Sequence, residues 1–186
     1  MRYALRLADA ADREGVAELV ATSARGLGAA DYSDVQIEGA LKGAFGLDTQ
    51  LIADRTYYVV EDGGGQLVAC GGWSYRGTLF GGDQAEQRDA ATLVPGRDAA
   101  KIRAFFVHPD HARRGLGTLI LERCEMAAAE QGFRQAELMA TLTGLKLYAA
   151  RGYEPGEPVE HELAPGLTIS FVPMTKTLGE GIVPLP

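Results

Sequence analysis

The sequence has few cysteines, few histidines and no long apolar run. Its 186 residues include 2 cysteines and 3 histidines, which argues against a disulfide-stabilised scaffold and against a Cys- or His-rich metal site. No apolar stretch approaches the roughly 20 residues of a membrane span, and the N-terminus lacks the apolar core of a signal peptide. Cys70 lies in a predicted strand and Cys124 on the apolar face of a predicted helix, so both are expected to be buried thiols. We therefore expect a cytoplasmic protein with no membrane partner and no bound metal.

Basic residues are scarce relative to acidic ones. The 18 Lys and Arg residues stand against 25 Asp and Glu residues, which gives a formal net charge of −7. An acidic chain is a poor match for a phosphate backbone, so nucleic acid is not an expected partner. The charge is compatible with attraction of a cationic small molecule, although solubility alone accounts for it. The length suits one domain, which we predict over residues 1–178, followed by a flexible tail over residues 179–186 that is rich in glycine and proline.

The most informative pattern runs from Lys101 to Gly132 and predicts a strand, a turn and a helix. The strand is apolar and should end before Pro109, which has no N–H for a sheet ladder. The helix is amphipathic, with one apolar face made by Leu116, Leu119, Ile120, Cys124 and Ala127. Gly132 stands where a helix C-cap belongs.

The turn of this unit, Arg113–Thr118, has the features of an anion site. Gly115 and Gly117 allow a ligand to approach the backbone, and the first helical turn presents free N–H groups. Arg113 and Arg114 add cationic donors, so a phosphate or pyrophosphate is the predicted ligand. There is no Gly-Lys-Ser/Thr, and the third glycine of a dinucleotide fingerprint is replaced, which excludes two common phosphate loops. An ordinary strand-to-helix turn with solvated arginines remains the alternative.

The rest of the chain alternates strands and helices. A first strand, Arg2–Leu7, precedes a helix that Asp9 caps and that ends at Gly26–Gly28. A weaker helix starts near Asp31 or Ser33 and is expected to reach Phe45. The further predicted elements are a hairpin of Thr56–Glu61 and Gln66–Tyr75, a strand Gln135–Leu142, a short helix Thr143–Arg151, and a hairpin of Glu157–Leu163 and Leu167–Thr175. Gly71-Gly72 suggests a bulge, and residues 76–100 show no periodicity.

Two motifs resemble the GNAT superfamily of N-acetyltransferases. The first is Val107-His108-Pro109 followed by Gly115 and Gly117, and the second is the segment Leu147-Tyr148 to Gly152-Tyr153. Two positions depart from the family pattern, because Ala112 replaces an Arg or Gln and Thr141 replaces a frequent Asn. The resemblance covers nearly the whole chain.

The resemblance implies an α/β (α+β) GNAT fold with a mixed, mostly antiparallel central sheet of about seven strands flanked by helices. Strands four and five should be parallel neighbours that splay apart. Acetyl-coenzyme A would lie in the gap, with its pantetheine arm along the fourth strand. The residues implied to bind it are Phe106, Val107, Arg113, Arg114, Gly115, Leu116, Gly117, Thr118, Thr143 and Tyr148.

The implied reaction is acetyl transfer to a primary amine by direct attack, with Tyr148 as the catalytic general acid. A core tyrosine that only packs is the alternative. No general base is assigned among His108, His111, His161 and Glu137, and a water relay would need none. No acyl-carrying cysteine, Ser-His-Asp order or metal-ligand cluster is present, which disfavours a hydrolase or lyase.

The acceptor is expected to be a small-molecule or peptide amine of unknown identity. The proposed pocket residues are Tyr32, Phe45, Trp73, Phe80 and Glu137, although each also fits a packing or surface role. Residues 76–100 are interpreted as a flap near this pocket, with a disordered insert as the alternative. The competing function is a non-catalytic acyl-CoA-binding sensor. A homodimer is expected, because two-fold dimers are common and the apolar tail could dock on a neighbour.

Overall fold

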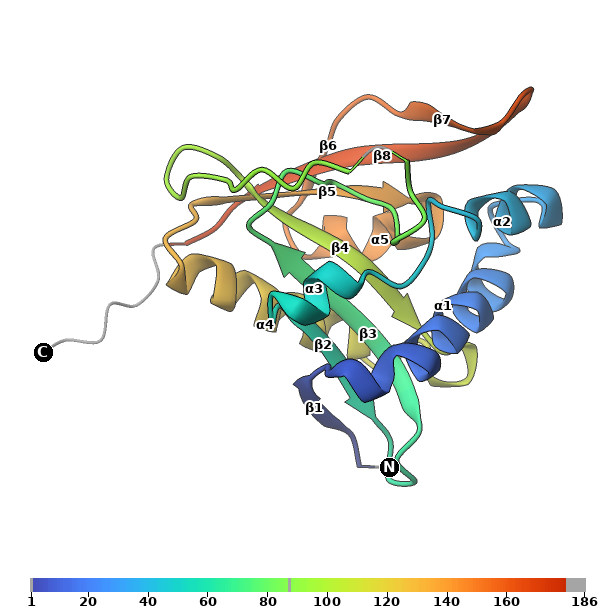
Figure 1. The fold of residues 1–186 in the computed structure, drawn as a ribbon, viewed down its shortest axis with the longest axis horizontal. Helices are drawn as coiled ribbons and strands as arrows, with labels where there is room; N and C mark the ends of the chain where they lie inside the picture. The colour runs from blue at the N-terminus through green and yellow to red at the C-terminus, as the bar shows by residue number, and fades with distance from the viewer. Residues whose placement is uncertain (1, 87, 180–186) are drawn as a thin grey trace, which may run out of the picture.

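The computed structural model describes residues 2–86 and 88–179, which form one mixed sheet with helices on both faces (Figure 1). The helices are α1 (Arg13–Gly28), α2 (Asp34–Ala40), α3 (Thr49–Ala53), α4 (Leu116–Glu130) and α5 (Leu145–Ala150). The strands are β1 (Ala4–Leu7), β2 (Tyr57–Glu61), β3 (Leu67–Ser74), β4 (Ala100–Val107), β5 (Gln135–Thr141), β6 (Glu154–Pro155), β7 (Val159–Ala164) and β8 (Leu167–Thr177). The predicted tail lies outside the described residues except for Gly179.

The sheet is antiparallel throughout its described part except between β4 and β5. Its order is β1-β2-β3-β4-β5-β8-β6, and β7 also pairs with β8. This confirms the predicted mixed, mostly antiparallel sheet with parallel strands four and five. The described residues give eight strands instead of about seven, because the two-residue strand β6 has too little sequence to show a pattern.

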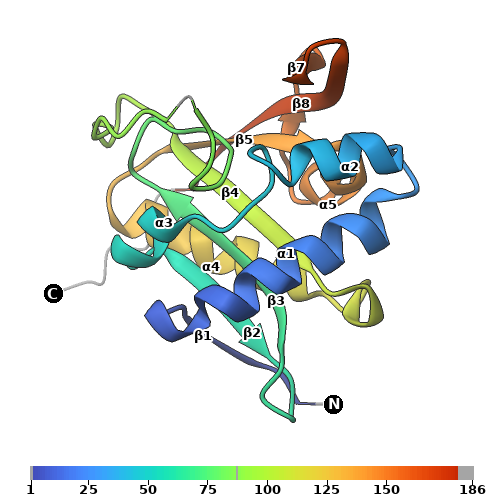
Figure 2. The ribbon, with the colours of Figure 1, turned by 45° about the vertical axis from the view of Figure 1, so that its right-hand side comes forward.

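The period-two alternation of the central strands divides the core between the two sheet faces. Tyr57 and Val59 pack in the cluster under α1 and α2, whereas Tyr58 and Val60 pack in the cluster under α4. Figure 2 shows α1 crossing one face of the sheet, with α4 behind it. The apolar run Tyr57–Val60 of β2 is therefore explained by burial on both faces of the sheet.

The first two helices start from side-chain caps. Asp9 and Asp12 form a reciprocal capping box on a short 3-10 turn that leads into α1, and Ser33 forms another with Gln36 at α2. Gly26 does not end α1, since the helix continues to Gly28. The prediction for α2 was too long: the helix ends at Ala40, and Phe45 lies in the turns that follow.

The insert over residues 76–100 is ordered in its described part, so the disordered alternative is wrong. Its two ends pair through an Arg76–Thr92 bridge, and Thr78 N–H donates to the carbonyl of Asp89 at 2.9 Å. We call residues 76–93 the flap. The flap meets the segment after α2, where Gly82 N–H donates to the carbonyl of Gly43 at 2.9 Å. The short helix α3 begins six residues after Gly43, and sequence patterns did not predict it.

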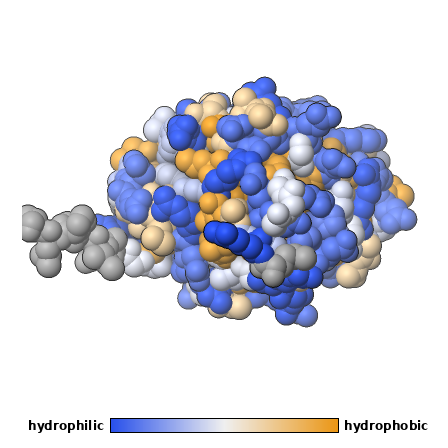
Figure 3. Space-filling view, turned by 90° about the horizontal axis from the view of Figure 1, so that it is seen from below, coloured by the Kyte–Doolittle hydropathy of each residue, from blue (hydrophilic) through white to orange (hydrophobic). Residues whose placement is uncertain are grey.

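Both thiols lie inside the protein, and a few apolar side chains lie on its surface. Within residues 2–86 and 88–179, no helix is long and apolar enough to cross a membrane. Cys70 and Cys124 are both free and buried, as predicted. The face in Figure 3 is largely hydrophilic, with hydrophobic residues gathered near its centre and others at its edges. Leu119 and Met126, at positions i and i+7 of α4, are exposed apolar side chains, 39% and 56% accessible.

Candidate active site

The centre of the site is a gap between β4 and β5. The two strands pair only from Ala100–Ala136 to Ile102–Leu138, although β4 continues to Val107 and β5 to Thr141. The splay that the family resemblance implies is therefore present, and it leaves the second half of β4 without a pairing partner on that side. An unpaired strand edge inside a protein offers a place for a ligand to add as an extra strand.

A bulge in β4 shapes the gap. Ala104 has φ +59, and the β3–β4 register shifts between Cys70 and Gly72. Gly71, opposite the bulge, has no room for a side chain because an added Cβ would lie 2.7 Å from the Phe105 ring. Gly71 is therefore explained by a close approach of β4, whereas Gly72 is explained by a close approach of β2, since an added Cβ there would lie 2.7 Å from Tyr57.

One backbone amide of β4, that of Val107, is directed to the side of the gap. His108 N–H donates to the carbonyl of Val68 on β3 at 2.8 Å, so the Val107 amide points away from β3. That amide donates to Ser23 Oγ on α1 at 3.1 Å. This amide is thus directed to the side of the gap and away from the β3 ladder.

The glycine turn ends the gap on one side. Gly115 is the N-cap of α4 with φ +81, and nothing lies within 4 Å of a Cβ added there. Arg113 also has a positive φ of +60, and the side chains of Arg113 and Arg114 are exposed. Arg114 donates to the Tyr3 hydroxyl at 3.3 Å. An open helix N-terminus flanked by two arginines is the expected environment for an anion.

The remaining residues of the turn secure the helix. Leu116 is buried in the core under α4, and Thr118 is half-buried. An added Cβ at Gly117 would lie 3.0 Å from Leu147, so this glycine permits close packing of α4 against α5.

A cavity of about 70 Å³ opens on the gap from the side of α2 and the flap. It is lined from the segment after α2, the flap, the bulge region of β4, the end of β5, α5 and β8. The lining residues are Ala44, Phe45, Gly46, Leu79, Phe80, Gly81, Ile102, Arg103, Ala104, Phe105, Phe106, Met139, Thr141, Tyr148 and Phe171. Phe45, Phe80 and Tyr148, all predicted site residues, are therefore brought together.

Tyr148 lies against the bulge. Its ring packs edge-on to Phe105, with ring centroids 6.2 Å apart, and to Tyr153 at 5.8 Å. Only 8% of the residue is exposed. Burial raises the pKa of Tyr148 above that of an ordinary tyrosine, so the phenol is protonated at neutral pH.

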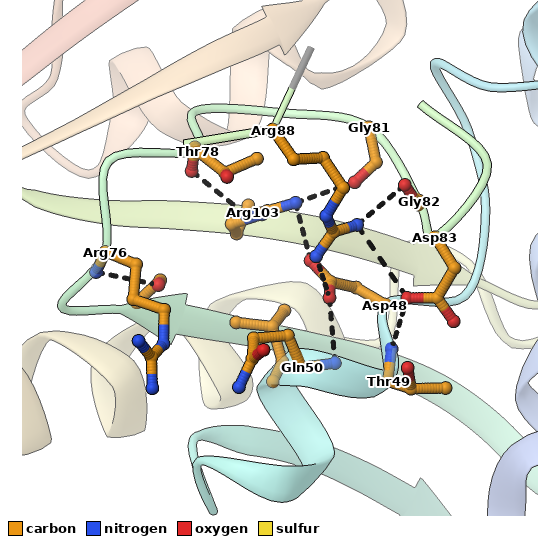
Figure 4. A network of polar contacts seen from close by, with 12 residues as sticks. Asp48, Thr49, Gln50, Arg76, Thr78, Gly81, Gly82, Asp83, Arg88 and Arg103 are labelled. Carbon is orange, nitrogen blue, oxygen red and sulfur yellow. Dashed lines mark hydrogen bonds and ion pairs between the residues drawn. The ribbon is translucent and has the colours of Figure 1, made fainter. Parts of the chain in front are cut away.

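A buried ion network fixes the flap over β4 (Figure 4). Arg103, one residue before the bulge, donates to the carbonyls of Thr78 at 2.9 Å and Gly81 at 2.6 Å. Its guanidinium also lies 2.5 Å from the carboxylate of Asp48, a residue that is fully buried. Arg88 reaches the same carboxylate at 2.8 Å and the carbonyl of Gly82 at 2.7 Å.

Sequence patterns missed this network. Asp48, Arg88 and Arg103 are distant in the sequence, and none belongs to a motif. Ser23, which binds the Val107 amide, was missed for the same reason.

The other predicted pocket residues lie outside the cavity lining. Tyr32 donates to the carbonyl of Ser170 at 2.8 Å and accepts from Leu142 N–H at 2.8 Å, so its hydroxyl ties the loop before α2 to β8 and to the end of β5. The Glu137 carboxylate is paired with Lys101 on β4. Trp73 is 3% exposed and packs against Phe133 on the α4 face.

Thr143, a predicted cofactor contact, is exposed and donates to Asp31 at 2.7 Å. His108 accepts from Asp110 N–H at 3.2 Å, as expected for a turn-capping histidine. His161 is half-buried, and its ring lies 5.0 Å from Phe80 and 6.1 Å from Phe171. It therefore stands behind the wall of the cavity.

Comparison with known sequences identifies one family. The profile described as the acetyltransferase (GNAT) domain matches residues 53–155, which contain the bulge, the glycine turn and Tyr148. Among curated proteins, none gives a significant match.

Solved structures share the fold over nearly the whole chain. A GCN5-related N-acetyltransferase from Rhodopseudomonas palustris, described as an aminotransferase of class II, superposes with TM-score 0.69 at 22% identity and covers 96% of this chain and 97% of its own. The PaiA N-acetyltransferase of Thermoplasma acidophilum, in complex with coenzyme A, gives 0.65 at 13% identity, with coverages of 95% and 99%. A phosphinothricin acetyltransferase of Sinorhizobium meliloti, in complex with acetyl-coenzyme A, gives 0.62 at 18% identity, with coverages of 100% and 94%.

Proposed function

Because the chain belongs to the GNAT acetyltransferase family, we propose that it transfers the acetyl group of acetyl-coenzyme A to a primary amine by direct attack on the thioester. The observation that carries this proposal is the gap between β4 and β5. It has an open glycine turn at one end, a protonated buried tyrosine beside it and a separate cavity on its other side.

The residues present fit acetyl-coenzyme A as the co-substrate, which supplies the activated acetyl thioester. The open space at Gly115 and the N-terminus of α4 suit its pyrophosphate, with Arg113 and Arg114 as cationic donors. The free edge of β4 suits its extended arm, with backbone contacts at Phe106 and Val107. Contact with the Val107 amide requires the Ser23 hydroxyl to leave its present position. Two of the solved structures similar in fold were determined with coenzyme A or acetyl-coenzyme A bound.

The bulge prepares backbone N–H groups for the thioester carbonyl. Negative charge develops on that oxygen as the amine attacks, and amides fixed in place stabilise it without reorganisation. A backbone N–H of β4 near Phe106–Val107 is the donor we assign to this role. It lies close to the bulge at Ala104, whose φ is +59.

Tyr148 protonates the departing thiolate. A free thiol has a pKa of about 8.5 and a free phenol about 10, so the transfer is slightly uphill in water. Burial raises the pKa of the phenol, and it raises the pKa of a thiolate formed in the same dry site as well. The proton transfer therefore stays close to balanced, while the phenol remains fully protonated at the start of the reaction.

The competing candidate is a non-catalytic acyl-CoA-binding protein on the same fold. It would keep the glycine turn but has no use for a buried, protonated phenol beside the cofactor gap. Tyr148 therefore favours catalysis.

The test is to supply acetyl-coenzyme A with a panel of amines and to measure release of free coenzyme A. The panel contains alkyl amines, polyamines, amino acids, peptide N-termini and aminoglycosides. We expect at least one acceptor to accelerate the release and to gain one acetyl group by mass. Tight binding of acetyl-coenzyme A with no amine-dependent release across the panel would favour the non-catalytic candidate. Buried, unpaired cysteines support a reducing, cytoplasmic location for this reaction.

A further inference from the structure

The cavity that opens on the gap has aromatic walls. Phe45 and Phe171 are 7% and 3% exposed, and their ring centroids lie 6.1 Å apart. Phe106 lies 5.9 Å from Phe45, and Phe80 lies 5.4 Å from Phe171. The four rings come from the segment after α2, the flap, β4 and β8, so they meet only in the folded chain. A ligand portion that enters between them is stabilised by burial of apolar surface.

The same walls offer no carboxylate. Among the described residues that line the cavity, none is Asp or Glu, and the charged one is Arg103. Two acids beside this region are already paired, Asp48 with two arginines and Glu137 with Lys101. A second ammonium group on a ligand would therefore lose its water beside an arginine without gaining a counter-ion, which is strongly unfavourable.

We propose, building on the acetyl transfer proposed above, that the acceptor is a monoamine with an apolar aliphatic or aromatic body, and that polyamines and aminoglycosides are excluded. The apolar part lies between Phe45, Phe80, Phe106 and Phe171, and the single amino group faces the gap beside Tyr148. The four rings select the body, and the missing carboxylate selects against additional charge.

The same apolar environment favours binding of the amine in its neutral form. A dry apolar site disfavours the ammonium form and lowers the pKa of the bound amine. The acceptor therefore gives one proton to water as it enters and is bound neutral. Its nitrogen forms a bond to the acetyl carbon, the carbon–sulfur bond breaks, and Tyr148 gives its proton to the thiolate. The second proton lost from nitrogen leaves through water and restores the phenol, so no carboxylate or histidine base is required.

The discriminating experiment compares hexylamine with 1,6-diaminohexane as acceptors. The two have the same chain length and the same reacting amine, and they differ by a second ammonium group. We expect kcat/KM for hexylamine to exceed that for the diamine by at least about tenfold. Equal values, or a preference for the diamine or for spermidine, would overturn the inference while leaving N-acetyl transfer intact.

A binding measurement separates failure of this inference from failure of the proposed function. Calorimetric titration of both amines into the protein saturated with coenzyme A needs no turnover. Tighter binding of hexylamine without any acetylation would retain the acceptor class and reject the reaction for these amines. Equal binding, or no binding of either amine, would reject the acceptor class.

A pair of variants tests whether the lack of a carboxylate in the cavity wall excludes diamines. Phe80→Asp places a carboxylate in the wall of the cavity, and we expect it to shift the kcat/KM ratio at least about tenfold toward the diamine. Leu93→Asp is the control, since Leu93 is also half-buried but does not line this cavity. A ratio that moves equally in both variants, or in neither, would contradict the proposed placement of the acceptor.

Discussion

The hydroxyl of Tyr148 is the proton donor that we assign to the leaving thiolate. Tyr148→Phe keeps the ring packed against Phe105 and removes only that proton. We expect turnover to fall by about 10²–10⁴-fold, the usual contribution of a positioned acid. The affinity for acetyl-coenzyme A and the melting temperature should change little, as measured by calorimetry and thermal unfolding.

Tyr153→Phe is the matched control for this prediction. Tyr153 is 3% exposed and its ring lies 5.8 Å from that of Tyr148, but it does not line the cavity. Its loss of a hydroxyl should leave turnover near the wild-type value. Equal effects of the two substitutions would make Tyr148 a core residue and leave the thiolate to be protonated by water.

The ion pair at the base of the flap predicts a pH dependence of stability. Arg76 lies 2.7 Å from Asp54 and holds the pKa of that carboxyl below its ordinary value. A carboxyl with a lowered pKa in the folded state contributes its full stability above the unfolded pKa of about 3.9 and loses it as pH falls further. Asp54→Asn should therefore reduce the free energy of unfolding by about 1–3 kcal/mol at pH 7.

The difference between the wild type and Asp54→Asn should stay constant above about pH 5 and shrink below about pH 4. Urea unfolding across this range measures it. A difference that grows as the solution is acidified would contradict the assignment, since it would require a raised pKa for Asp54.

Single residues were predictable where a local pattern carries their role. Gly115 was recognisable because it follows a strand and begins an amphipathic helix, and Tyr148 because of the residues around it. Arg103 was not, since a lone arginine inside an apolar strand has no local partner in the sequence. Its partner Asp48 and the carbonyls that it holds are brought to it only by the chain fold.

The flap is the element whose position depends most on buried charge. Arg88 links Asp48 to the carbonyl of Gly82, beside the flap residues that line the cavity. Arg88→Met should let this end of the flap move and raise KM for the acceptor by about tenfold, equivalent to about 1.4 kcal/mol. The affinity for acetyl-coenzyme A should not change, because the glycine turn lies on the other side of the gap.

Arg97→Met controls for loss of an arginine from the same insert, since Arg97 is exposed and pairs with the adjacent Asp98. Arg88→Lys should restore part of the acceptor affinity. If Arg88→Met and Arg97→Met have the same steady-state constants, the ion network does not position the flap.

Elements with a clear period were predicted within a few residues, whereas short or irregular ones were not. β4 and α4 have long apolar patterns and were assigned correctly. The five-residue helix α3 is too short to show a period, and α2 was extended too far because Phe45 and Leu41 fit a helical spacing. The order within residues 76–100 comes from contacts with β4 and with the segment after α2, which no local pattern contains.

At the scale of the whole molecule, we propose that two copies associate through the outer face of α4. Leu119 and Met126 share one side of that helix and are both exposed, 39% and 56% accessible. The wild type should behave as a dimer in light scattering at micromolar concentration. Met126→Lys should convert it to a monomer with little loss of folding stability.

Val35→Lys is the control for this substitution, because Val35 is 65% exposed but lies on α2 on the opposite side of the sheet. It should leave the dimer intact. A wild-type mass equal to one chain would exclude the dimer at that concentration, and dissociation by both substitutions would exclude α4 as its specific interface.

The burial of both cysteines has a practical consequence for measurement. Cys70 and Cys124 have no exposed surface, and burial raises the pKa of Cys70 to about 12, so neither forms a reactive thiolate in the native protein. A colorimetric thiol reagent such as dithionitrobenzoate should count no sulfhydryl in the native chain within minutes and 2 in denaturant. Coenzyme A would then be the only fast-reacting thiol in a turnover assay. Slow labelling of the enzyme would report how often its interior opens, and rapid labelling of the native chain would contradict the burial.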